Sequence, residues 1–181
     1  MKIYAETDRI IMREIVMEDA PAMFEMDSDP EVQRYLHKNP IQTIDQAVSS
    51  IKYIRQQYID YGIGRWAIID KKTNQFAGWG GLKFRTDEVN GYTNFHDVGY
   101  RLLRKFWGQG FATESAKATL KYAFEELGLK VVYALADIDN KASINALRKS
   151  GLKITARIEH EGILCEWFEI LQEEWRRFSY I

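Results

Sequence analysis

A glycine-rich turn, RKFWGQGFATES at residues 104–115, constrains the fold of this chain more than any other stretch. A strand-like run precedes it, and an apolar pattern with helical spacing follows it. At such a junction several backbone N–H groups and the positive end of a helix dipole meet, so the turn favours an anion such as a pyrophosphate. Glycine also lets the backbone approach a ligand closely. The alternative interpretation is that Gly108 and Gly110 only shape the turn.

Two common nucleotide motifs do not fit this turn. A P-loop is absent, because neither glycine is followed by Lys and then Ser or Thr. A dinucleotide-binding turn would need Gly or Ala where Thr113 stands, and Asp137 comes too late to be its ribose-binding acid. The sequence therefore disfavours both.

Composition excludes several classes of function. The 181 residues suit a single domain over 1–181, and the net charge of -1 gives no general attraction to nucleic acid or to an anionic membrane. No stretch approaches 18 apolar residues, so we expect a cytoplasmic protein, either a monomer or a homodimer. The single cysteine excludes an internal disulfide, and His37, His96 and His160 lack metal-ligand spacing, so we expect no metal.

The order of hydrophobic patterns predicts the fold class. The first third is a strand, DRIIMREIV, and then helices over MEDAPAMFEM, DPEVQRYL and a segment that a Thr43–Gln46 capping box opens and Gly62 ends. An antiparallel meander follows, formed by RWAIID, FAGWGGLKF and HDVGYRLL. After the glycine turn and its helix come the strand KVVYALAD, the helix NKASINALRKSG and a hairpin spanning LKITARIEHEGILCEWFEILQEEW. We expect an α+β fold, in which helices flank a mixed, largely antiparallel central sheet.

Two motifs carry a resemblance to a known family. The stretch GYRLLRKFWGQGFATES resembles the acetyl-CoA motif of the GNAT superfamily of N-acetyltransferases, [QR]-x-x-G-x-[GA]. Gly108 and Gly110 match that pattern, whereas Lys105 stands where Gln or Arg is usual. The second signature, DNKASINALRKSGL, follows at the expected distance. Together with TDRIIMRE near the start, these two sequences are similar to the RimJ/RimL branch, which acetylates protein N-termini and has relatives acting on small amines.

The resemblance implies the GNAT, or acyl-CoA N-acyltransferase, fold and acetyl-CoA as cofactor. In that fold the strands on either side of the turn splay apart, and the pantetheine arm lies in the gap. Leu102 and Leu103 would pair with the arm, while Asn140 and Ser143 would contact the cofactor from the far side. Asn140 could equally be a simple helix N-cap. The pyrophosphate would be wrapped by Arg104, Lys105, Gly108, Gln109, Gly110, Phe111 and Ala112.

The resemblance also implies candidate catalytic groups. Many GNAT enzymes protonate the departing thiolate with a tyrosine, but Leu147 stands at that position. The resemblance leaves Ser143 as the candidate thiol-side donor and Asp97, where the branch often has Glu, as the candidate base. The plainer interpretations are a first-turn helix serine and a solvated strand aspartate. An α-amine needs only a weak base, because its pKa of about 7.7–8.0 leaves roughly a tenth of it neutral at pH 7.

Other conspicuous side chains have plainer interpretations. His96 is expected to be a surface histidine at a strand end. Cys165 lies in an apolar strand without a basic neighbour, so we expect a core cysteine and no covalent acetyl-enzyme. The aromatic residues should be core or cleft wall, among them Trp66, Trp79, Tyr100, Trp107 and Phe111.

The expected activity is acetyl transfer from acetyl-CoA to a primary amine by direct transfer in a ternary complex. A protein N-terminal α-amine is the first candidate acceptor. One alternative is a small amine such as a polyamine, an amino sugar or an aminoglycoside; acids in the acceptor pocket would favour a polyamine, and an open groove a peptide. A second alternative is a CoA-binding sensor or interaction module without activity.

Overall fold

The structure is a computed structural model that describes residues 1–36 and 38–179. Its strands are β1 (Ile3–Glu6), β2 (Ile10–Glu14), β3 (Arg65–Asp70), β4 (Gln75–Arg85), β5 (Phe95–Leu102), β6 (Val131–Asp137), β7 (Lys153–His160) and β8 (Ile163–Leu171). Its α-helices are α1 (Ala20–Asp27), α2 (Ile44–Tyr61), α3 (Phe111–Lys121), α4 (Lys141–Lys149) and α5 (Gln172–Ser179). Single helical turns lie at Met17–Asp19, Arg104–Phe106 and Tyr122–Glu126.

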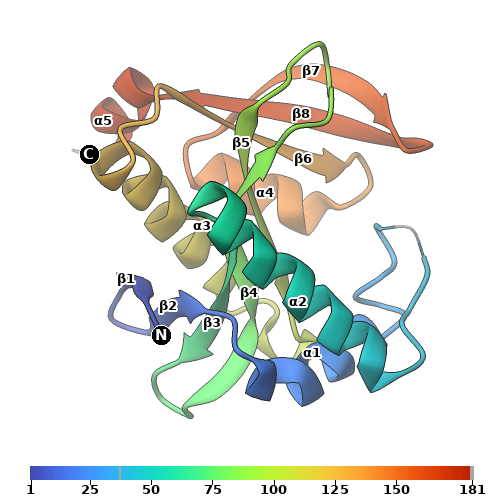
Figure 1. Cartoon of the computed structure of the whole chain (residues 1–181). Coiled ribbons are helices and arrows are strands. Elements are labelled where there is room, and N and C mark those ends of the chain that lie inside the picture. The colour runs from blue at the N-terminus through green and yellow to red at the C-terminus, as the bar shows by residue number, and fades with distance from the viewer. Residues whose placement is uncertain (37, 180–181) are drawn as a thin grey trace.

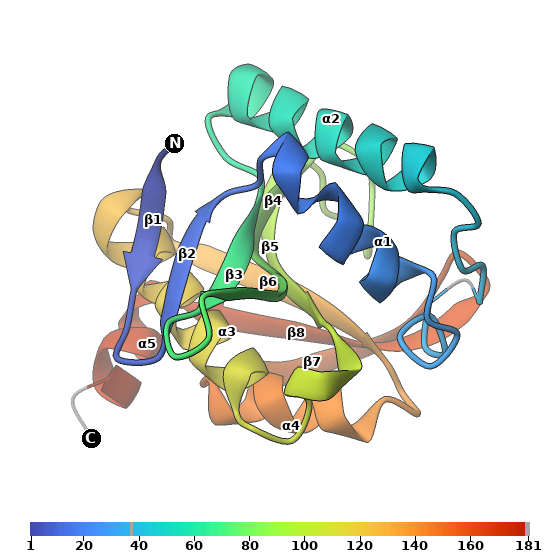
Figure 2. The ribbon, with the colours of Figure 1, turned by 90° about the horizontal axis from the view of Figure 1, so that it is seen from below.

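The strands form one mixed sheet in the order β1-β2-β3-β4-β5-β6-β8-β7 (Figure 1). Neighbouring strands of the described chain run antiparallel, except that β5 and β6 are parallel. Helices α1 and α2 cover one face of this sheet and α3 and α4 the other (Figure 2). The predicted α+β class, with helices flanking a largely antiparallel sheet, is confirmed.

The two parallel strands separate soon after they meet. β5 pairs with β4 from Gly78–Leu102 to Arg85–Phe95, whereas it pairs with β6 at Asp97–Tyr133. Beyond Asp97 the C-terminal half of β5 therefore diverges from β6. The V-shaped opening that the resemblance implies is present at the middle of the sheet.

Apolar side chains of the strands form two buried clusters. Trp66, Met12 and Ile68 are fully buried between the sheet and its helices. A second cluster packs Phe95, Tyr133 and Trp167 against one another across β5, β6 and β8. Both clusters follow from strands whose inward positions are apolar, so the central sheet is a rigid support for the opening.

Three details differ from the sequence-based expectations. The helix predicted over DPEVQRYL is wrong, because residues 30–36 form turns. One backbone hydrogen bond spans four residues, from the Gln33 N–H to the Asp29 carbonyl, and another spans three, from the Leu36 N–H to the Gln33 carbonyl. So short a run does not offset the cost of starting a helix. Strand β1 was not anticipated, and the closing hairpin ends at Leu171, where α5 takes over.

The helix α2 begins and ends where its signals indicate. Gln46 Oε1 accepts a hydrogen bond of 3.1 Å from the Thr43 N–H, and Gly62 ends the helix with a φ of 70°. No helix in the described part of the chain is both long enough and apolar enough to cross a membrane.

Candidate functional site

The opening between β5 and β6 forms a cavity of about 250 Å³. Its walls come from the diverging ends of these strands, from one face of α4, from the β7–β8 hairpin and from the turns after α1. Asp97, Asn140 and Ser143, three of the residues singled out from the sequence, line it together. The fold thus brings the predicted catalytic pair to one cleft.

Asn140 and Ser143 lie at the start of α4, and both have defined partners. Asn140 Oδ1 accepts a hydrogen bond of 3.1 Å from the Ser143 N–H, so Asn140 is the helix N-cap. The Tyr100 hydroxyl donates to the Ser143 carbonyl at 3.0 Å and lies 3.2 Å from Ser143 Oγ. Burial raises the pKa of Tyr100 to about 12, so its phenol keeps its proton. Leu147 lines the same wall of the cavity and is apolar. The hydroxyls of Tyr100 and Ser143 are the polar groups beside it.

The glycine turn leads directly into α3. Gly110 is the N-cap of α3 with a φ of 84°, and Gly108 has a φ of 70°. A Cβ on Gly108 would meet no atom within 4 Å, so the backbone conformation and not crowding favours glycine there. The first-turn amides of α3 have no intrahelical acceptors, as at any helix start. Since the turn around Gly108 and Gly110 is also exposed, it suits a phosphate group.

The basic residues of the turn are already in exposed ion pairs. Arg104 Nε lies 3.1 Å from an Asp29 carboxylate oxygen, and Lys105 Nζ lies 3.5 Å from Glu25 Oε1. Half or more of each basic side chain is exposed, so these pairs contribute only about 0–1 kcal/mol and can be exchanged for a phosphate. The sequence analysis missed Arg9, whose Nη1 donates to the Gln109 carbonyl at 2.8 Å.

The other predicted cofactor contacts are partly enclosed. The side chains of Leu102, Leu103 and Phe111 are buried, and Ala112 is half-buried. The Leu102 carbonyl accepts from Trp107 Nε1 at 2.9 Å, and the Leu103 N–H donates to the Ala77 carbonyl at 2.9 Å. Pairing of these two leucines with a pantetheine arm stays a prediction.

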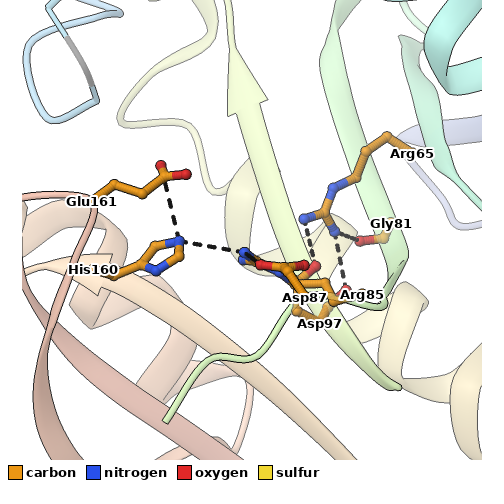
Figure 3. Close-up of polar contacts among 7 residues, drawn as sticks. All are labelled: Arg65, Gly81, Arg85, Asp87, Asp97, His160 and Glu161. Carbon is orange, nitrogen blue, oxygen red and sulfur yellow. Dashed lines mark hydrogen bonds and ion pairs between the residues drawn. The ribbon is translucent and has the colours of Figure 1, made fainter. Parts of the chain in front are cut away.

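Asp97 also lines the cleft, where it is the centre of a buried charge cluster (Figure 3). Only 5% of it is exposed, so the interpretation as a solvated aspartate is wrong. Arg65 Nη2 lies 2.6 Å from Asp97 Oδ1, and Arg85 Nη1 lies 3.5 Å from Oδ2. A Cβ on Gly99 would stand 2.7 Å from Arg65 Nη2, so the glycine makes room for the guanidinium. Burial lowers the pKa of Arg65, while Asp97 opposes that shift.

Arg85 connects this cluster to the β7–β8 hairpin. Its Nε and Nη2 donate to Asp87 at 3.1 and 2.5 Å, and its Nη2 lies 3.3 Å from His160 Nε2. Figure 3 shows His160 and Glu161 facing Arg85 from the hairpin side. The sequence analysis missed Arg65, Arg85 and His160, because they come from three separate strands and form no local motif.

The remaining candidates have less direct roles. Cys165 lines the cleft but is buried, and burial together with Asp137 raises the pKa of its thiol to about 11, which disfavours a nucleophilic thiolate. His96 packs on Phe84, and burial lowers its pKa. Trp66 and Phe111 are core residues, Trp79 and Tyr100 are cleft wall as expected, but 44% of Trp107 is exposed. His37 lies outside the described residues.

The cleft and its motifs can be compared with known proteins. The family model described as an acetyltransferase (GNAT) domain matches residues 9–153. The chain belongs to this family. A relative in Bacillus subtilis, the uncharacterized N-acetyltransferase YoaA, is 32% identical over 162 residues, which cover 90% of this chain and 86% of YoaA. This GNAT chain is therefore an N-acetyltransferase that uses acetyl-CoA.

Two solved structures have the same fold at low sequence identity. One is RimL, an α-N-protein acetyltransferase of ribosomal L7/L12 in complex with coenzyme A, with a TM-score of 0.78, 17% identity, and coverage of 94% of this chain and 98% of RimL. The other is the spermidine N-acetyltransferase of Vibrio cholerae with CoA and spermine, with a TM-score of 0.74, 16% identity, and coverage of 94% and 99%. At these identities both comparisons show the fold and leave the acceptor open.

Proposed function

We propose that this GNAT acetyltransferase transfers an acetyl group directly from acetyl-CoA to the α-amine at a protein N-terminus, in the manner of the RimJ/RimL branch. One observation carries the choice of acceptor: two buried guanidiniums, of Arg65 and Arg85, line the end of the cleft around Asp97. A polyamine or an aminoglycoside would bring several positive charges against them. A peptide N-terminus brings one amine.

The hydrogen bond between Asp97 and Arg65 supports the same choice of acceptor. Asp97 Oδ1 accepts a hydrogen bond of 2.6 Å from Arg65 Nη2, so one of its two oxygens is already engaged. An α-amine, with a pKa of about 7.7–8.0, is already partly neutral at pH 7, whereas a lysine amine, with a pKa of about 10.4, needs a stronger base. The cleft therefore suits an α-amine, whose protonated form has the lower pKa, better than a lysine amine.

Different residues of the site would bind the cofactor, donate to the thiolate and accept the proton of the amine. When bound, acetyl-CoA supplies the activated acetyl group. The turn at Gly108–Gly110 would bind its pyrophosphate through backbone N–H groups. Ser143 would be the thiol-side donor, with its Oγ–H hydrogen-bonded to the departing thiolate, and Tyr100, which donates to the Ser143 carbonyl, would orient the serine. Asp97 stays the predicted base at the acceptor end.

Two rival functions have distinct signatures. A small-amine acetyltransferase would act on spermidine or an aminoglycoside at least as well as on a peptide. An inactive CoA-binding module would bind acetyl-CoA tightly and release no thiol with any amine.

The test is thiol release from acetyl-CoA with a matched panel of acceptors. The panel contains one lysine-containing peptide with a free N-terminus, the same peptide with a blocked N-terminus, spermidine, an amino sugar and an aminoglycoside, and calorimetry follows acetyl-CoA binding in parallel. We expect turnover with the free peptide and at least tenfold less with the other acceptors. Equal rates with the blocked peptide, or faster rates with spermidine, would overturn the proposed acceptor, and binding without any turnover would overturn the proposed activity.

A further inference from the structure

The acceptor end of the cleft holds two largely buried guanidiniums and one buried carboxylate. Arg65, Arg85 and Asp97 have side chains that are 12%, 13% and 7% exposed, so two guanidiniums face one carboxylate inside the protein. The second carboxylate, Asp87, contacts Arg85 from outside and is 53% exposed, so solvent screens its charge. A guanidinium in the wall of a cavity can bind an anion that enters the cavity, through donors that its existing partners do not fill.

The donors of Arg85 show where such an anion would bind. Its Nε and one Nη2 hydrogen point to Asp87, and Nη2 also contacts His160. Its Nη1 faces Asp97 Oδ2 at 3.5 Å, which is longer than a charge-assisted hydrogen bond. The Nη1 edge therefore has capacity for a closer acceptor. His160, which also lines the cleft, lies beside it.

Two other acids, Asp137 and Glu161, also line the cleft. Asp137 Oδ1 accepts from the Asp139 N–H at 2.8 Å, in the turn that leads to α4. Glu161 is 58% exposed at the hairpin tip, 4.0 Å from His160. The first is engaged elsewhere, and water screens the second.

We propose, on the basis of the transferase function above, that the acceptor carries a carboxylate close to its amine and that Arg85, with His160 beside it, binds this carboxylate. A guanidinium binds a carboxylate through two parallel hydrogen bonds, which also fixes the orientation of the neighbouring amine. Two sources have this chemistry: the side chain of an N-terminal Asp or Glu in a peptide, and the α-carboxylate of a free amino acid. Arg85 is then a specificity-determining residue.

The first experiment uses the wild-type enzyme and acceptors of matched size. Thiol release gives kcat/KM for three peptides that differ only in an N-terminal Asp, Asn or Lys, and for free methionine beside methionine amide. We expect the Asp peptide to exceed the Asn peptide about tenfold or more, and the Lys peptide to be slowest. If free amino acids are the source, methionine will exceed its amide by a similar factor.

The outcomes separate this inference from the proposed function. Turnover with equal rates for Asp and Asn peptides and for methionine and its amide would overturn the inference and leave the transferase function intact. Absence of turnover with every acceptor would overturn both.

The second experiment assigns the preference to Arg85. We expect Arg85→Gln to bring the Asp-to-Asn ratio close to one, and Arg85→Lys, which keeps the charge without the planar fork, to retain part of it. Arg157→Gln, on the edge strand β7 with a side chain that is 57% exposed, is the matched control and should keep the wild-type ratio. Should Arg85→Gln fail to bind acetyl-CoA by calorimetry, His160→Gln replaces it, with an expected fall in the same ratio. A full preference in the folded variant would overturn the role of Arg85.

Discussion

The two ends of the cleft are built in different ways. The predicted donor site combines two local segments: the glycine turn with the start of α3, which lies outside the residues that line the cavity, and the first turn of α4, which lines it. The acceptor end is assembled from β3, β4 and β5, which are neighbours in the sheet, and from the β7–β8 hairpin, whose His160 contacts Arg85. Local geometry therefore defines the donor end, and tertiary packing defines the acceptor end.

The charges at the two ends differ in the same way. Arg104 and Lys105 at the turn form exposed pairs that a phosphate can replace at little cost. Arg65 and Asp97 form a buried pair that cannot be broken without leaving an uncompensated charge. This difference suits a donor common to a whole family at one end and a selected acceptor at the other.

The largest expected effect on function is loss of acetyl-CoA binding in Gly110→Asp. The carboxylate would stand where the pyrophosphate is expected, and the φ of 84° disfavours any side chain there. We expect affinity to fall at least about 100-fold by calorimetry. Gly110→Asn separates charge from strain. Gly128→Asp, at another glycine with a positive φ of 62°, is the control that should bind normally. Unchanged affinity in Gly110→Asp would remove the turn from the donor site.

The next effect is on stability and concerns the acceptor end. Arg65→Met leaves Asp97 buried without its 2.6 Å partner, so we expect unfolding free energy to fall by about 3–5 kcal/mol in urea titrations. Lys71→Met removes an exposed pair with Glu6 and should cost about 1 kcal/mol or less. Similar losses in both variants would contradict the contrast between buried and exposed pairs.

A smaller effect is expected on the chemical step. Ser143→Ala should lower kcat about 100-fold and Tyr100→Phe about tenfold, with acetyl-CoA affinity preserved. Because the pKa of Tyr100 is raised to about 12, its donor form is complete at lower pH and is lost only as pH rises through that value. The wild-type rate should therefore not fall near pH 10, where an ordinary tyrosine ionises. Tyr53→Phe, at an exposed position on α2, is the control. A wild-type rate in Ser143→Ala would exclude the serine as the donor.

The smallest effect is expected at Cys165. Its thiol, with a pKa raised to about 11, stays protonated near neutral pH and is a poor nucleophile. Cys165→Ala should keep kcat within about twofold of wild type, since direct transfer requires no thiol on the protein. A folded variant without activity would point to a covalent route.

The difference between local geometry and tertiary packing also determines which features could be predicted from the sequence. The order of strands and helices and the glycine turn follow from local patterns, and so does the spacing of Asn140 and Ser143. Tyr100 was anticipated as a cleft wall, but its contact with Ser143 depends on how α4 packs beside β5. Arg65 and His160 carry no local signal, because only the register of the sheet and the closing hairpin places them near Asp97. The short run at residues 30–36 was misassigned because its pattern is helical but too brief to form a helix.

The measurement that tests the central claim most directly is the initial rate of CoA release with both substrates varied. Donor and acceptor ends of one cleft imply that acetyl-CoA and the peptide amine are bound together when the acetyl group moves. Double-reciprocal plots should then give intersecting lines, and Cys165→Ala should show the same pattern. Parallel lines, with an acetylated enzyme isolated in the absence of acceptor, would contradict the account.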